Sequence, residues 1–281
     1  MRLSPATRNF LRGGVVITLA FIYIPLIVIA IYAFNGGNSL VWPPPSLTTE
    51  WFPKAIENTG AREALWTSLR VGAVATGIAL LLGSLASFAV ARYRFFGRET
   101  ISFLVILPIA LPGVVTGVAL SNTFTQVLGV PLSLLTVIAG HATFCIVVVY
   151  NNVIARLRRV SGNFEEASAD LGAHTWQTFR FVTLPSIRTA LVAGGLLAFA
   201  LSFDEIIVTN FTIGAGEQTL PIWIFSNLFR PNNLPIVNVV AVIVVLLSII
   251  PVYLAHRLTR EEGVTARAGG AGAIAESTAV P

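Results

Sequence analysis

The stretch that decides the fold covers residues 100–155 and reads TISFLVILPIALPGVVTGVALSNTFTQVLGVPLSLLTVIAGHATFCIVVVYNNVIA. It contains no Asp, Glu, Lys or Arg. A helix that crosses a bilayer needs about 20 largely apolar residues, so this stretch is too long for one crossing. Gly129-Val130-Pro131 divides it, which predicts two membrane spans joined by a short turn.

The composition of the whole chain agrees with a membrane location. Of its 281 residues, 55% are hydrophobic and 11% are charged, and the mean hydropathy is +0.79. A soluble domain normally carries about 25% charged residues. This argues against a soluble enzyme, a disordered protein and a nucleic-acid-binding domain, despite a pI near 10.0. The single cysteine, Cys145, excludes an internal disulfide and a cysteine-based metal cluster.

Four further apolar runs bring the number of predicted spans to six. They are residues 13–34, about 65–91, about 188–211 and 234–255. The first follows three arginines, but its length and the lack of a small-residue cleavage site indicate a retained span rather than a removed signal peptide. We therefore predict an all-α, polytopic membrane protein with six transmembrane helices.

The basic residues are distributed unevenly between the segments that connect these spans. The N-terminus, residues 92–99, residues 152–188 and the tail from residue 256 together hold 14 arginines. The opposite loops hold only Lys54, Arg62 and Arg230. Because basic residues accumulate on the cytoplasmic side of a membrane, we predict that both termini are cytoplasmic.

The largest predicted cytoplasmic segment contains SGNFEEASADLGAHTWQTFRFVTLP, residues 161–185. Asn163 is a suitable N-cap and Glu166 falls at the third helical position, which predicts a capping box. Gly172 suits a left-handed helix stop. The pattern predicts a short helix that ends near this glycine.

A second short helix can begin near Thr175 and carry Trp176 and Phe179 on one side. Pro185 then suits the first turn of the following span. The segment is therefore a predicted helix-turn-helix between two spans. It can serve only as a connection, with Glu166 as a cap, or it can dock into a groove of a cytoplasmic partner with the two aromatic residues as anchors.

The spacing of this segment resembles the EAA loop of ABC importer permeases. Glu166-Ala167-Ser168, Gly172 and Val182-Thr183-Leu184-Pro185 carry the resemblance, with Ser168 in place of the second alanine and Val182 in place of the usual isoleucine. Residues 64–69 with Ala91-Arg92-Tyr93 resemble the opening of the core permease domain. Leu107-Pro108 and Leu111-Pro112-Gly113 resemble its proline-broken third helix.

The resemblance covers about residues 60–256 and implies the type I ABC importer permease fold in a bacterial inner membrane. It implies three partners: a separate dimeric ABC ATPase, a second permease subunit, expected to be a paralogue, and an extracytoplasmic solute-binding protein. The residues expected to couple to the ATPase are Glu165, Glu166, Ala167, Ser168, Gly172, Leu184 and Pro185. We expect no catalytic residue, cofactor or metal site. The only lysine, Lys54, lies in Trp-Phe-Pro-Lys-Ala rather than in the Gly-rich loop that a P-loop requires.

We divide the chain accordingly. The predicted segments are a cytoplasmic N-terminus at 1–12, a first transmembrane helix at 13–34, an external loop at 35–59, a core permease domain with five transmembrane helices at 60–256, which contains the cytoplasmic coupling loop at 152–187, and a disordered cytoplasmic tail at 257–281.

Two acids, Asp204 and Glu205, lie within the fifth predicted span. Only 15 uncharged residues precede them after Arg188, so we expect the helix to continue through both. At about 1.5 Å rise per residue, Asp204 lies roughly 20 Å beyond Arg188. Ionisable residues inside a membrane typically mark a transport pathway, but a structural pair with Arg70, His141 or a partner subunit is the alternative. Adjacent helical residues diverge by about 100°, so at most one acid faces a pore directly.

Residues 202–206, residues 219–223 and Asn238 resemble permeases of the spermidine/putrescine importer family, which implies a polyamine or a related organic cation as the substrate. Another solute, such as ferric ion, an amino-acid derivative or an anion, is the alternative within this class. An ion-driven secondary transporter would normally show an internal repeat, and we find none. An intramembrane protease using Ser84, His141 or Asp204 lacks a Gly-x-Ser-x-Gly elbow and a second membrane aspartate. We interpret His141 as an interior histidine whose hydrogen bonds are satisfied.

Overall fold

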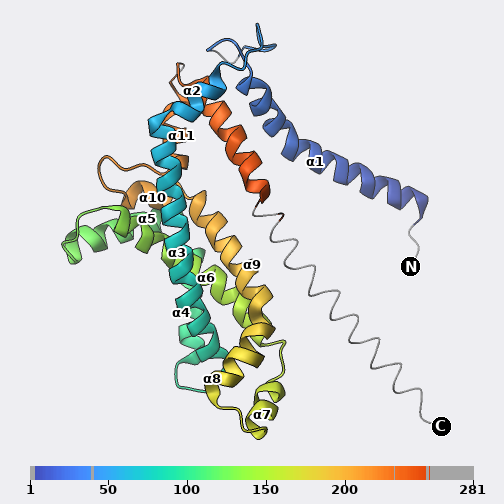
Figure 1. The fold of residues 1–281 in the computed structure, drawn as a ribbon, viewed down its shortest axis with the longest axis vertical. Coiled ribbons are helices and arrows are strands. Elements are labelled where there is room, and N and C mark those ends of the chain that lie inside the picture. The colour runs from blue at the N-terminus through green and yellow to red at the C-terminus, as the bar shows by residue number, and fades with distance from the viewer. Residues whose placement is uncertain (1–3, 39–40, 231, 251–252, 254–281) are drawn as a thin grey trace. The chain divides into compact units, whose positions relative to one another are not determined.

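The computed structural model describes residues 4–38, 41–230, 232–250 and 253 (Figure 1). Within these residues the protein is helical, and the only β pairing is an isolated bridge between Asn35 and Leu47. The predicted all-α class is therefore confirmed. The chain forms two compact units, Met1–Glu63 with Trp223–Ser248 and Ala64–Ile222 with Ile249–Pro281.

The first unit contains α1 (Pro5–Ala33) and α2 (Trp51–Glu57). Helix α1 begins eight residues before the predicted span, because the hydroxyl of Ser4 caps it by accepting the amide hydrogen of Thr7. Only its last two residues are buried. The unit also contains most of α11 (Leu220–Leu228) and most of a shorter apolar helix at Leu234–Ile250. The predicted sixth span continues to residue 255, and all but one of its last five residues, like the predicted tail at 257–281, lie outside the described residues.

The second unit carries the elements of the candidate sites. In chain order they are most of α3 (Thr59–Arg92), α4 (Arg98–Ala110), α5 (Gly113–Asn122), η1 (Thr123–Val127), α6 (Leu134–Leu157), α7 (Asn163–Asp170), α8 (Thr175–Thr178), η2 (Phe179–Thr183), α9 (Leu184–Phe203) and α10 (Ile207–Thr212). Figure 1 shows α7 and α8 at one end of this unit and α5 and α10 toward the other.

Four described helices are long and apolar enough to cross a membrane: α1, α3, α6 and the continuous helix Thr175–Phe203. A fifth span is possible if α4 and the helix Gly113–Val127 form one crossing, although they bend by 105°. The bend lies at Leu111 and Pro112, as predicted, because proline lacks an amide hydrogen and does not continue the helix. The six-span count, the cytoplasmic termini and the domain boundaries stay predictions.

Helix α6 forms the centre of the second unit. Its buried side chains Cys145, Val149 and Val153 pack in one apolar cluster that includes Ile187 and Ala198. Close contact with α3 depends on Gly83, where a Cβ would lie 2.9 Å from the carbonyl oxygen of residue 146. Gly83 therefore serves close packing of α3 against α6.

Candidate functional site

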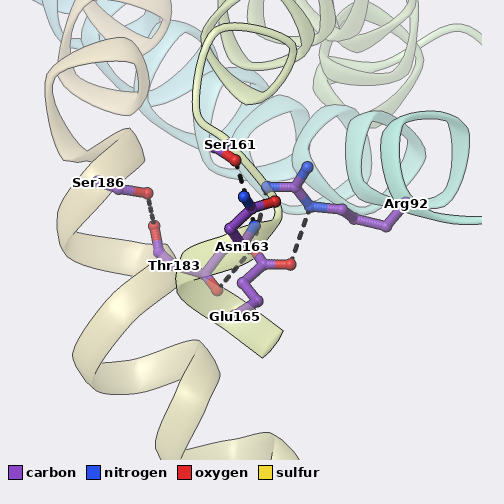
Figure 2. Close-up of polar contacts among 6 residues, drawn as sticks. All are labelled: Arg92, Ser161, Asn163, Glu165, Thr183 and Ser186. Carbon is purple, nitrogen blue, oxygen red and sulfur yellow. Dashed lines mark hydrogen bonds and ion pairs between the residues drawn. The ribbon is translucent and has the colours of Figure 1, made fainter. Parts of the chain in front are cut away.

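The loop between α6 and α9 contains the first candidate site. Helix α7 begins at Asn163, so this residue is not the N-cap, and the predicted capping box is wrong. The reason is that Gly162 already adopts a helical conformation, and its carbonyl oxygen accepts the amide hydrogens of Glu165 and Glu166. The amide of Asn163 instead donates to the hydroxyl of Ser161 at 3.3 Å (Figure 2).

The end of α7 agrees with the prediction. Gly172 has a φ of +85°, which places it in the left-handed region that glycine adopts without strain. The amide of Ala173 donates back to the carbonyl of Ser168 at 3.1 Å, which satisfies an otherwise unpaired carbonyl at the helix end. Gly172 therefore fixes the turn between α7 and α8.

The second short helix also begins where the sequence predicts, at Thr175. The side chain of Gln177 accepts the amide hydrogen of His174 and caps this helix at 3.0 Å. Trp176 and Phe179 stack with ring centroids 5.5 Å apart. Pro185 lies in the first turn of α9, but η2 joins α8 to α9 without interruption, so the loop leads directly into a membrane-length helix.

Glu165 connects α7 to two other helices (Figure 2). One carboxylate oxygen accepts a hydrogen bond from Nη2 of Arg92, the last residue of α3, at 3.0 Å. The other lies 3.0 Å from Nε of the same guanidinium, which is an ion-pair contact without a hydrogen bond from Nε. The hydroxyl of Thr183, at the end of η2, donates to the same carboxylate at 3.0 Å. We call Arg92, Glu165 and Thr183 the clamp.

The remaining side chains of α7 divide into two faces. Ser168 shares the face of Glu165, and its hydroxyl lies 3.1 Å from that of Thr178, which joins α7 to α8. Glu166 and Ala167 are exposed. The large apolar side chains Phe164, Leu171 and Trp176 are also 65%, 89% and 61% exposed. Because such side chains are rarely left in water together, this outer face has the character of a docking surface.

The acids of the second candidate site do not lie in a continuous helix as predicted. Helix α9 ends at Phe203, residues 204–206 are not helical, and α10 begins at Ile207. The prediction that the helix continues through Asp204 and Glu205 is therefore wrong. It assumed a straight helix of full membrane length, whereas α10 turns away to pack on α5, where Gly117 leaves room for Phe211.

The two acids have different environments. The carboxylate of Glu205 accepts the amide hydrogen of Val208 at 2.8 Å and thereby caps the first turn of α10. Asp204 is exposed, and within the described part of the chain its carboxylate has no hydrogen bond or ion pair. Glu205 is thus occupied by a structural contact and Asp204 is available to a ligand.

His141 is buried on α6 and contacts both sides of this break. Its Nδ1 lies 2.8 Å from the hydroxyl of Ser202, near the end of α9, and its Nε2 lies 2.7 Å from the hydroxyl of Thr209 on α10. The interpretation of His141 as an interior histidine with satisfied hydrogen bonds is confirmed. It bonds hydroxyl groups rather than the acids, and Arg70 lies over the ring of Trp66 instead.

Sequence reasoning did not identify the clamp or the partners of His141. Arg92 was named only among the residues that carry the family resemblance. No role was predicted for Thr183, Ser202 or Thr209. Ion pairs and hydroxyl contacts between residues 61 to 73 positions apart leave no local pattern in a sequence.

Several apolar helices of membrane length and a proline-broken pair of helices indicate an integral membrane protein. A family model described as "binding-protein-dependent transport system inner membrane component" matches residues 79–261. The chain belongs to this family. It is therefore a permease component located in the inner membrane, as the sequence analysis predicts.

Individual relatives agree with this assignment. The putrescine transport system permease protein PotI of Escherichia coli (strain K12) is 33% identical over 231 residues, which are 80% of this chain and 81% of PotI. The spermidine/putrescine transport system permease protein PotC of the same strain is 31% identical over 256 residues, 90% of this chain and 96% of PotC.

A solved structure of a bacterial ABC transporter that imports alginate gives a TM-score of 0.67 at 18% identity, covering 93% of this chain and 99% of that one. At this identity the similarity bears on the fold alone. It confirms the ABC importer permease fold.

Proposed function

We propose that this permease conducts polyamines or related organic cations, and that Asp204 is the pathway residue that interacts with them. The relatives PotI and PotC are putrescine and spermidine/putrescine permeases, which supports this substrate class. The observation that carries the proposal is the exposed Asp204 at the break between α9 and α10, next to a glutamate whose carboxylate is already used.

The electrostatic reason is simple. A polyammonium ion loses hydration when it enters a low-dielectric channel, and a carboxylate without a protein partner offsets that loss. A carboxylate that already accepts a backbone hydrogen bond stabilises a passing cation less. One exposed acid also provides a weak site rather than a trap, and conduction requires that a solute can leave as well as enter.

The loop between α6 and α9 couples this pathway to ATP hydrolysis in the proposed mechanism. The outer face of α7, with Glu166 and Ala167, docks on a separate dimeric ABC ATPase on the cytoplasmic side. The clamp then passes movement of α7 to α3 and to the helix that continues into α9, because Glu165 is bonded to Arg92 and Thr183. Gly172, Leu184 and Pro185 preserve the turn and the helix start. A second permease subunit and an extracytoplasmic solute-binding protein complete the importer.

The test uses the chain expressed with its partner subunits in cells without another polyamine importer. We expect ATP-dependent uptake of labelled spermidine or putrescine, and Glu166→Lys should abolish it while the protein remains in the membrane. Glu99→Lys, an equal charge change at an exposed position on α4, is the matched control and should retain uptake. Normal uptake by Glu166→Lys would refute the docking role. Uptake of another solute, with no polyamine uptake, would refute the substrate class.

A further inference from the structure

The geometry points to His141 as a positioning residue for the transport pathway: it holds the break between α9 and α10 in one shape and so sets where Asp204 stands. This inference rests on the proposed pathway role of Asp204. His141 is 0% exposed and lies on α6, which forms the centre of this unit. Its two ring nitrogens bind residues on opposite sides of the three non-helical residues 204–206.

The hydrogen-bond inventory assigns the direction of each bond. The hydroxyl of Thr209 has one hydrogen, and it donates this to the carbonyl oxygen of Glu205 at 2.8 Å. It must therefore accept from Nε2–H of His141. In the neutral ring Nδ1 is then the acceptor, and the hydroxyl of Ser202 donates to it. The neutral imidazole with hydrogen on Nε2 satisfies every member of this set.

These hydrogen bonds of His141 with Ser202 and Thr209 fix the backbone conformation around Asp204. Through Thr209, His141 restrains the carbonyl of Glu205, the residue directly after Asp204. Through Ser202, it restrains the last turn of α9, two residues before Asp204. The two nitrogens belong to one rigid ring, so the ends of the break are held at one separation. At the far end of α10, the hydroxyl of Thr136 on α6 lies 2.7 Å from the carbonyl oxygen of Thr212 and also 2.7 Å from that of Ser133, so its one hydrogen is shared between them.

A neutral residue suits this position. A charged side chain buried here would compete with Asp204 for the cation or pair with Asp204 and remove it from the pathway. An apolar residue of similar volume would fill the space but remove the acceptor of Ser202 and the donor to Thr209. A side-chain amide, which carries both an N–H donor group and an acceptor oxygen, can replace the imidazole in part.

The functional experiment measures two rates in the purified importer complex reconstituted in proteoliposomes: spermidine transported and ATP hydrolysed. We expect His141→Phe and Thr209→Val to lower spermidine transported per ATP about tenfold, whereas His141→Gln and Thr209→Ser lower it less than threefold. Thr143→Val is the matched control, because it removes a hydroxyl from α6 that, among the described residues, bonds only the carbonyl of Gly140 of the same helix. It should leave the ratio unchanged.

Dependence on Asp204 is tested by a double variant. If His141 acts through Asp204, adding His141→Phe to Asp204→Asn should lower the ratio no further than Asp204→Asn alone. Equal losses of transport and ATP hydrolysis in His141→Phe would assign it a structural role only and overturn the inference. An additive loss in the double variant would do the same. If Asp204→Asn itself has no effect, the proposed pathway role fails first.

A second measurement needs no knowledge of the transported solute. Asp204→Cys is labelled in the assembled complex with a positively charged thiosulfonate reagent, and the native Cys145 is buried and should not react. We expect His141→Phe to change the labelling rate of position 204 at least fivefold and His141→Gln to change it less than twofold. An unchanged rate in His141→Phe would overturn the inference even if the substrate is not a polyamine.

Discussion

The clamp on α7 and the set of bonds around His141 perform similar mechanical tasks with different chemistry. In both, one side chain bonds two others and ties separate helices together. The clamp uses a full ion pair, and the side chains of Arg92 and Glu165 are 22% and 25% exposed. His141, Ser202 and Thr209 are neutral and buried.

The difference follows from the cost of removing charges from water. Water still reaches the clamp, so its charges keep part of their hydration and the ion pair adds specificity at a modest desolvation cost. In the apolar interior, removing the same two charges from water would cost about several kcal/mol of hydration free energy per ion. Because His141, Ser202 and Thr209 are neutral, the exposed charge beside the break is that of Asp204.

Reversal of one charge in the clamp should give the largest effect. Glu165→Arg places two guanidinium groups together and removes the acceptor of Thr183, so we expect uptake to fall at least tenfold, consistent with about 3 kcal/mol for a broken, partly buried pair. The exchange Glu165→Arg with Arg92→Glu restores the pair and should recover a substantial part of uptake. If the exchanged protein is no better than the single variant, the pair does not transmit movement through its charges.

The two acids at the break should respond differently to loss of charge. Asp204→Asn removes the exposed carboxylate, and we expect polyamine uptake to fall about tenfold, the factor that corresponds to about 1.4 kcal/mol. Glu205→Gln keeps an oxygen that can accept the amide hydrogen of Val208, so uptake should fall less than threefold. Initial uptake rates at saturating binding protein measure both. The reverse order would mean that Glu205 serves the pathway.

Salt should change the contribution of the clamp to the melting temperature, but not the contribution of the bonds around His141. Screening lengths fall from about 10 Å at 0.1 M salt to about 3 Å at 1 M. We therefore expect the loss of melting temperature in Glu165→Gln, about 2–4 °C at low salt, to shrink by about half at 1 M. The loss in Thr209→Val should not change, because its partners are neutral. Melting curves of the purified complex in detergent provide the measurement, and equal salt dependence would contradict the distinction.

The smallest effect should come from Ser168→Ala, which restores the small residue usual in the EAA pattern. It removes the contact between the hydroxyls of Ser168 and Thr178, worth about 0.5–1 kcal/mol. Both partners are only partly buried. Uptake should stay within twofold of the parent protein while the melting temperature drops slightly. Loss of uptake would show that this bond, rather than the clamp, holds α7 in place.

Several features were predictable because they depend on neighbouring residues. Gly172 ends α7 since a left-handed turn favours glycine, and Pro112 interrupts the broken span since it lacks an amide hydrogen. The position of α8 followed from the local pattern at Thr175. The capping prediction at Asn163 failed by one residue, because Gly162 has helical backbone angles and is itself the N-cap.

The sequence by itself determined that this protein is helical and lies in a membrane, and its motif spacing predicted the coupling loop, because apolar length and motif spacing are local properties. Only the tertiary structure decided that Glu205 caps α10 while Asp204 stays exposed, and that Arg92 and Thr183 hold Glu165. It also placed His141 across the break. These roles depend on which helices pack against α6 and α7, and side chains far apart in the chain acquire partners only when that packing brings them together.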